Sequence, residues 1–131
     1  MNLTVRLSAR PPATRTGHLF QIVMITAALT VGALQMYHIH GGLLTDYGAD
    51  AFGTAWVYAT MRLGRSVIQR GRPASAGHSA IVVFLLCLSW ELGQRAHVVP
   101  GRFDPFDIVT YAVTLSMCWA IDRRSPFVVT A

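Results

Sequence analysis

The sequence predicts an all-α fold: a polytopic membrane protein in which four transmembrane helices form one compact bundle. Hydrophobic residues make up 53% of the 131 residues and charged residues only 13%, whereas a soluble domain carries about 25% charge. The mean hydropathy of +0.43 indicates the same class. A chain of this length holds one domain. Four apolar runs, separated by loops rich in polar residues, Gly and Pro, are the predicted helices: 19–36, 47–63, 79–95 and 107–121.

The first apolar run, 19–36, is long enough for a membrane-spanning helix. Residues 1–17 before it contain Arg and Pro and are predicted to form a basic cytoplasmic tail. A cleaved signal peptide is the alternative, but no clear small-x-small cleavage site precedes Tyr37, which favours an uncleaved helix. The predicted transmembrane domain is 18–122, and 123–131 form a second cytoplasmic tail.

The run 47–63 differs from the others in its many small side chains, chiefly Gly, Ala and Thr. Small residues allow helices to approach closely inside a membrane. We therefore predict that this helix is the one most enclosed by protein. Several of the four runs are shorter than the roughly 20 residues needed to cross the hydrocarbon core. The helices are thus expected to continue through polar residues at their ends, and those ends are where functional residues are expected.

The arginines predict the orientation. Segments 1–18, 62–78 and 122–131 carry nine of the eleven, and the two opposite loops carry only Arg95 and Arg102. Cytoplasmic loops of membrane proteins are enriched in Lys and Arg. The protein is therefore predicted to be a multi-pass protein of the cell membrane with both termini in the cytoplasm. The same distribution explains the net charge of +5 without nucleic acid as a partner.

Acidic residues show the opposite distribution. Only Asp122 lies at the predicted inner side, beside Arg123 and Arg124. Acidic residues contribute little to membrane topology, so the other five need a separate explanation. They all fall at the predicted outer ends of helices: Asp46, Asp50, Glu91, Asp104 and Asp107.

Glu91, Gln94 and Arg95 are spaced at i, i+3 and i+4 and share one helix face. Glu91 lies one turn inside the end of its helix, beside Trp90. A charged group at that depth is costly and normally faces the bundle interior with a partner. Two interpretations stay open: Glu91 forms an ion pair with Arg95 or with another helix and locks the bundle, or it binds a ligand.

Asp46 and Asp50 share a face in the first turn of the second predicted helix, where acids favour the helix dipole. Thr45 or Asp46 is predicted to cap that helix. Asp50 is deeper, on the small-residue face, and is either structural or functional.

The segment Asp104-Pro105-Phe106-Asp107 has the pattern of a helix start. Asp104 is the expected N-cap and Pro105 suits the first helical position. Asp107 is less needed for capping and is predicted to point toward the outer end of the bundle.

Histidine and cysteine do not predict a metal centre. His38 and His40 form a His-x-His pair near acidic residues, but the loose spacing favours interfacial residues over a zinc site. Tyr37 and Trp90 are predicted interface anchors. Cys87 and Cys118 both lie inside apolar runs and are predicted to be free thiols. No metal and no cofactor is therefore expected.

Three short motifs carry a resemblance to a known family. The stretch Trp90–Gln94 is similar to the W-E-x-x-Q helix end of VanZ-like membrane proteins, and Gly101–Asp107 resembles their R-x-x-D-x-x-D loop before the last helix. The segment Asp46–Asp50 resembles the corresponding helix start in related small membrane proteins. The resemblance covers roughly 42–122 and departs from the family at Tyr111 and Ala112, which indicates a divergent relative. It implies a compact helical bundle whose motif residues meet at the outer membrane face, and it implies no reaction.

The first hypothesis is an outward-facing polar pocket that binds or helps process a cell-envelope ligand. Its ligand would be a lipid head group, a lipid-linked or cell-wall precursor, or a glycopeptide-type or cationic compound. The alternative is a structural or accessory subunit whose polar residues only lock the bundle, and a small cation or proton transporter is a third interpretation. Partners are the lipid bilayer and a second copy of the chain, and no enzymatic reaction is predicted. The candidate ligand-binding residues are Asp50, Glu91, Gln94, Arg95, Arg102, Asp104 and Asp107, with Tyr37, Asp46 and Tyr47 as secondary candidates.

Overall fold

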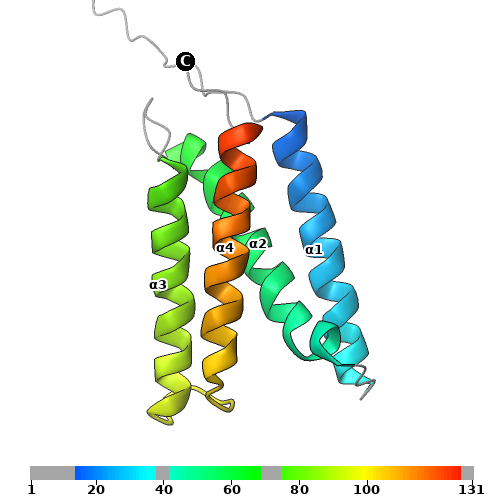
Figure 1. Ribbon diagram of the computed structural model, residues 1–131, viewed down its shortest axis with the longest axis vertical. Helices are drawn as coiled ribbons and strands as arrows, with labels where there is room; N and C mark the ends of the chain where they lie inside the picture. The colour runs from blue at the N-terminus through cyan, green and yellow to red at the C-terminus, as the bar shows by residue number, and fades with distance from the viewer. Residues whose placement is uncertain (1–13, 38–41, 69–74, 128–131) are drawn as a thin grey trace, which may run out of the picture.

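The computed structural model describes residues 14–37, 42–68 and 75–127. Within these ranges the chain forms four α-helices and no strand, which confirms the predicted all-α fold. Successive helices run in alternating directions along the molecule (Figure 1). Each helix contains or overlaps one predicted run and extends beyond it at one or both ends. The helices are α1 (Arg15–Met36), α2 (Leu43–Ile68), α3 (Ala76–Arg95) and α4 (Pro105–Arg124).

Three helices begin at side chains that accept a hydrogen bond from the first turn. The Thr14 hydroxyl accepts from Gly17 N at 3.1 Å, and the Ser75 hydroxyl accepts from His78 N at 3.2 Å. At α4, Asp104 Oδ1 accepts from Phe106 N at 2.9 Å, and Pro105 stands in the first turn. The N-cap predicted at Asp104 is therefore confirmed. Such caps satisfy amide groups that have no partner within the helix.

The predicted start of α2 is wrong. The helix begins at Leu43, because the Gly42 carbonyl accepts hydrogen bonds from Thr45 N at 3.0 Å and Asp46 N at 3.1 Å. Gly42 has a φ of +99°, which suits glycine at the turn before the helix. Thr45 and Asp46 consequently lie inside the helix and do not cap it. At its other end α2 continues to Ile68, through residues expected to belong to a loop.

Helix α2 is the centre of the fold. It packs against each of the other three helices, whereas α1 packs against α2 alone (Figure 1). Its buried residues include Ala55, Tyr58 and Ala59, which form one core with Val83 of α3 and with residues of α4. The prediction that the second helix is the most enclosed by protein is confirmed.

The core extends past the end of α4. Phe127 is completely buried, and its ring centroid lies 4.8 Å from that of Phe20 and 6.2 Å from that of Tyr58. Its carbonyl accepts a hydrogen bond from Thr14 N at 3.0 Å. A Cβ atom at Gly17 would lie 2.7 Å from that carbonyl oxygen, so only glycine fits there. Residues 122–127 are therefore part of the bundle, beyond the limit predicted at residue 122.

Asp122 is the centre of a buried polar network at this end of the bundle, which we call the Asp122 end. Its Oδ2 atom accepts hydrogen bonds from Tyr58 Oη at 2.9 Å and from Arg62 Nε. Its Oδ1 atom accepts from Phe127 N at 2.9 Å. Arg62 and Asp122 are 6% and 3% exposed. This ion pair joins α2 to α4 and fixes the segment that carries Phe127.

Two helices, α1 and α3, are long and apolar enough to cross a membrane. Few of their residues are buried within the protein, and side chains such as Leu29 and Ile81 are more than half exposed. The core helix of a soluble protein would instead be mostly buried. Exposed apolar side chains on this scale indicate an apolar environment, and they support association with a membrane.

Candidate functional site

Glu91 and Asp50 meet at the hydroxyl group of Tyr111, at the end of the bundle opposite to Asp122. Tyr111 Oη donates to Glu91 Oε1 at 3.0 Å and lies 3.4 Å from Asp50 Oδ1. Glu91 is 2% exposed and Tyr111 is 5% exposed. The three residues come from α3, α2 and α4, so this contact joins three helices. We call this end of the bundle the Glu91 end.

Gln94 connects Glu91 to the loop that follows α3. In the amide orientation that satisfies its neighbours, Gln94 Nε2 donates to Glu91 Oε2 at 3.2 Å and to the Arg102 carbonyl at 3.1 Å. Its Oε1 atom accepts from Trp90 Nε1 at 3.0 Å. Both oxygens of Glu91 therefore have donors. The shared face predicted for Glu91 and Gln94 is confirmed as a direct contact.

Two glycines let the loop between α3 and α4 fold back onto this amide. Gly101 has a φ of +135°, and a Cβ atom there would overlap the amide of Gln94. A Cβ atom at Gly93 would lie 2.9 Å from Val99. Residues with side chains rarely adopt such a φ. The position of Gln94, and through it that of Glu91, thus depends on glycine at 101.

Replacing Gly101 with alanine is expected to destabilise the protein by about 1–3 kcal/mol, because it forces a strained φ and displaces Gln94. The thermal unfolding of the full chain in detergent measures this loss. Gly32→Ala is the matched control, since a Cβ atom at that position on α1 would meet no neighbouring atom within 4 Å, and it should be neutral or slightly stabilising. Equal melting temperatures for the two variants would contradict the close approach at Gly101.

Asp104 and Asp107 lie beside the Glu91 contact. Asp104 Oδ2 accepts from Tyr47 Oη at 3.4 Å, which brings this secondary candidate to the site. Asp107 is half-buried and lies within electrostatic range of Asp50, Glu91 and Asp104. These four acidic residues form what we call the carboxylate cluster: Asp50, Glu91, Asp104 and Asp107.

A groove of about 300 Å³ opens beside the cluster, between α2 and α3. Val57, Leu86 and Trp90 make its walls largely apolar. Asp50 and Tyr111 also line it, and they supply its polar groups. The groove therefore presents an apolar surface next to a site of concentrated negative charge.

Other candidates lie outside this cluster. The guanidinium of Arg95 lies 5.5 Å from the centre of the Phe103 ring, and the predicted Glu91–Arg95 ion pair does not form. The reason is geometric, because the loop brings Phe103 to Arg95 while α4 brings Tyr111 to Glu91. Arg102 is exposed, and it reaches the site through its carbonyl group. Tyr37 and Asp46 are also exposed.

Sequence reasoning missed Tyr111 as a site residue, together with the network at the Asp122 end. A signal for both was present in α2, where Asp50, Thr54, Tyr58 and Arg62 follow one another at intervals of four. Residues at i and i+4 share a helix face. A polar stripe of this kind along an enclosed helix predicts buried hydrogen-bond partners on the neighbouring helices.

Within residues 14–37, 42–68 and 75–127, no group of three or more His, Cys, Asp or Glu residues is arranged to hold a metal ion. The His38 and His40 pair lies outside the described residues. Cys87 and Cys118 are both free thiols, as predicted. Thr54 Oγ1 lies 3.8 Å from Cys87 Sγ, on the groove wall.

Comparison with known proteins gives no relative to place beside this site. No protein-family model, no curated protein and no solved structure matches the chain.

Proposed function

We propose that the chain is an integral membrane protein with four spans, both termini in the cytoplasm and the carboxylate cluster at the outer face. The lengths of the helices support this. At 1.5 Å per residue, the 20 residues of α3 or α4 extend about 30 Å, which matches the hydrocarbon core of a bilayer. The arginine distribution in the sequence supports the orientation, because nine of the eleven fall in the three segments predicted to be cytoplasmic.

The lower hydropathy of α2 and α4 is compatible with four spans. Hydropathy averages all faces of a helix, but α2 is enclosed by three neighbours, and several of its polar groups point toward them. Tyr58 and Arg62 bond to Asp122 inside the protein, and Thr54 faces Cys87. In α4 many outward side chains are apolar, among them Val109, Val113 and Met117. Polar residues inside a membrane normally face the bundle interior in this way.

The proposed function is to bind an amphiphilic cell-envelope ligand through an amine-bearing, cationic head group. The observation that carries it is the largely apolar groove lined by Asp50, because Asp50 belongs to the carboxylate cluster. Two arginines are described at this end: Arg95, whose guanidinium lies against Phe103, and Arg102, which is exposed, and neither forms an ion pair with the described acidic residues. A cation is therefore the ligand head group that this charge favours. We also retain the proposal that the chain is a divergent VanZ-like protein, on the three motifs described above.

The test compares two lipids that differ only in the amine: phosphatidylethanolamine and its N-acetyl derivative with the same acyl chains. The purified full chain in detergent should bind the amine-bearing lipid at least tenfold more tightly in native mass spectrometry, about the value of one charged hydrogen bond. Asp50→Asn should remove this difference. Asp46→Asn removes the same charge one turn away, outside the groove, and should keep it. Equal binding of both lipids by the unchanged protein would overturn the proposal.

The second candidate is a structural subunit, and a specific observation favours it too. Both oxygens of Glu91 accept hydrogen bonds from the protein itself, from Tyr111 and Gln94. If the cluster only locks the helices, Glu91→Gln and Asp50→Asn should both lower the melting temperature while neither changes lipid preference. If the cluster binds a ligand, Asp50→Asn should abolish the preference and leave the melting temperature of the ligand-free protein within a few degrees.

A further inference from the structure

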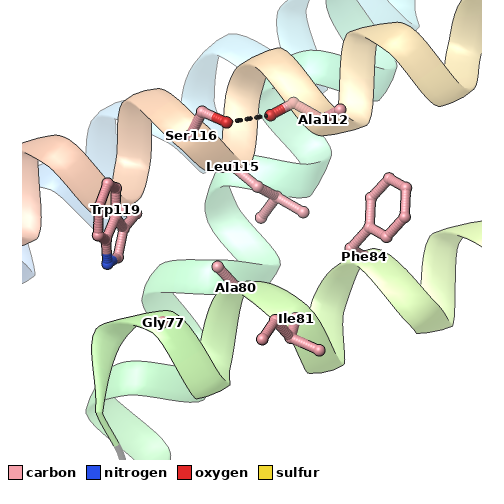
Figure 2. A pocket seen from close by; sticks show the side chains of 8 residues that line it. All are labelled: Gly77, Ala80, Ile81, Phe84, Ala112, Leu115, Ser116 and Trp119. Carbon is pink, nitrogen blue, oxygen red and sulfur yellow. Dashed lines mark hydrogen bonds between the residues drawn. The ribbon is translucent and has the colours of Figure 1, made fainter.

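A second groove, of about 410 Å³, lies between α3 and α4 (Figure 2), and its floor includes Leu115 of the core. Its surface is almost entirely apolar, and the side chains of Ile81, Phe84 and Leu115 project into or beside it. The hydroxyl of Ser116 is bonded to the Ala112 carbonyl at 2.8 Å, so the groove wall offers little polarity. Along α3 it runs from Gly77 to Phe84, about 10 Å of helix.

At one end of the groove lie groups that carry positive charge or donate hydrogen bonds. The indole nitrogen of Trp119 faces the first turn of α3 across the groove (Figure 2). It donates to no acceptor in the described part of the chain. The guanidinium of Arg123 lies 4.8 Å from the centre of the Trp119 ring. The N-terminus of α3 adds the positive end of its helix dipole.

The acidic group nearest in sequence does not cancel this charge. Asp122 is buried and accepts hydrogen bonds from Arg62, Tyr58 and Phe127 on the core side of α4. On α3 and α4, the other charged or titratable groups described at this end are Arg124 and His78, both exposed, and Arg15 and His18 lie at the same end on α1. The mouth of the groove therefore carries a net positive charge.

We propose that this groove binds one acyl chain of an anionic phospholipid from the cytoplasmic leaflet, with the phosphate at Arg123, Trp119 and the first turn of α3. Basic pockets between helices on the cytoplasmic side bind anionic lipid head groups in this manner. The inference rests on the membrane insertion proposed above, and it is independent of the amine-bearing ligand proposed for the carboxylate cluster.

The test measures binding of phosphatidylglycerol and phosphatidylcholine with identical acyl chains to the full chain by native mass spectrometry. Phosphatidylglycerol should bind about fivefold more tightly, the value expected for one arginine near the head group, and the difference should shrink at high salt. Arg123→Gln should remove the preference. Arg15→Gln is the matched control, because Arg15 is an exposed arginine at the same end on α1, which packs away from α3 and α4, and it should retain the preference.

A second pair of variants tests the acyl-chain part. Ala112→Leu fills the groove and should weaken binding of both lipids severalfold, whereas Ala33→Leu makes the same change on the exposed surface of α1 and should not. Helix content by circular dichroism checks that each variant folds.

Equal binding of the two lipids by the unchanged protein, or an unchanged preference in Arg123→Gln, would overturn the proposal. The proposal would also be overturned if the unchanged protein formed a stable dimer that Ala112→Leu dissociates, because a second copy would then occupy the groove. The same comparison in the Asp50→Asn variant separates the two proposals, because a cationic choline head group then gains nothing from Asp50, and phosphatidylglycerol should still bind more tightly.

Discussion

Asp122→Ala is expected to lower the free energy of unfolding by about 3–5 kcal/mol, because it leaves Arg62 buried without its carboxylate partner. Arg62 is 6% exposed, and Asp122 also accepts from Tyr58 Oη and Phe127 N. The substitution therefore disrupts the contact between α2 and α4 and releases the segment after α4. Unfolding of the detergent-solubilised protein by sodium dodecyl sulfate, followed by circular dichroism, measures this loss.

A double-mutant cycle assigns the loss to the ion pair. Arg62→Met combined with Asp122→Ala should cost less than the sum of the two single variants, because the uncompensated charge is then gone. Arg124→Gln removes an exposed charge two residues away and should change stability by less than about 0.5 kcal/mol. Additive single and double variants would show that the two side chains do not act as a pair.

Phe127→Ala is the second substitution with a large expected effect, about 3–5 kcal/mol of unfolding free energy. The side chain is completely buried between Phe20 and Tyr58, so removing the ring leaves a cavity and the neighbouring rings lose contact. The hydrogen bonds of the Phe127 backbone to Thr14 and Asp122 hold the cavity open, which limits relaxation.

Phe106→Ala is the matched control for this prediction. Phe106 is 65% exposed at the start of α4, and its removal should cost less than about 1 kcal/mol in the same assay. A smaller loss for Phe127→Ala than for Phe106→Ala would mean that the segment after α4 does not pack into the core.

Hydrophobic runs predicted the number and order of the described helices and the C-terminal ends of α1 and α3, but not the other helix ends. The runs 19–36 and 79–95 lie inside α1 and α3. The ends extend further because Thr14 and Ser75, polar residues outside the runs, cap the helices. The burial of Phe127 could not be predicted from a single aromatic residue in a short tail. Its position follows from Gly17, whose missing side chain allows the approach.

The sequence predicted the acidic residues of the candidate site, but it did not predict all the side chains that form hydrogen bonds with them. The i, i+3 spacing correctly predicted that Glu91 lies beside Gln94, and the helix-start pattern correctly predicted that Asp104 caps the last helix. Spacing within one helix also suggested Arg95 as the partner of Glu91, and that was wrong. The actual partner, Tyr111, comes from another helix. Contacts between helices depend on how the helices rotate and cross, which a single sequence does not encode in its spacing.

The proposal places the Glu91 end outside the cell and the Asp122 end inside, and labelling of single cysteines tests this placement most directly. In a background with Cys87→Ala and Cys118→Ala, one variant carries Arg102→Cys and another carries Ser125→Cys, both at exposed positions. A membrane-impermeant maleimide should label the Arg102→Cys variant in intact cells. It should label the Ser125→Cys variant only after the membrane is permeabilised. The reverse result, or labelling of both variants in intact cells, would contradict the proposed four-span topology and the outward position of the carboxylate cluster.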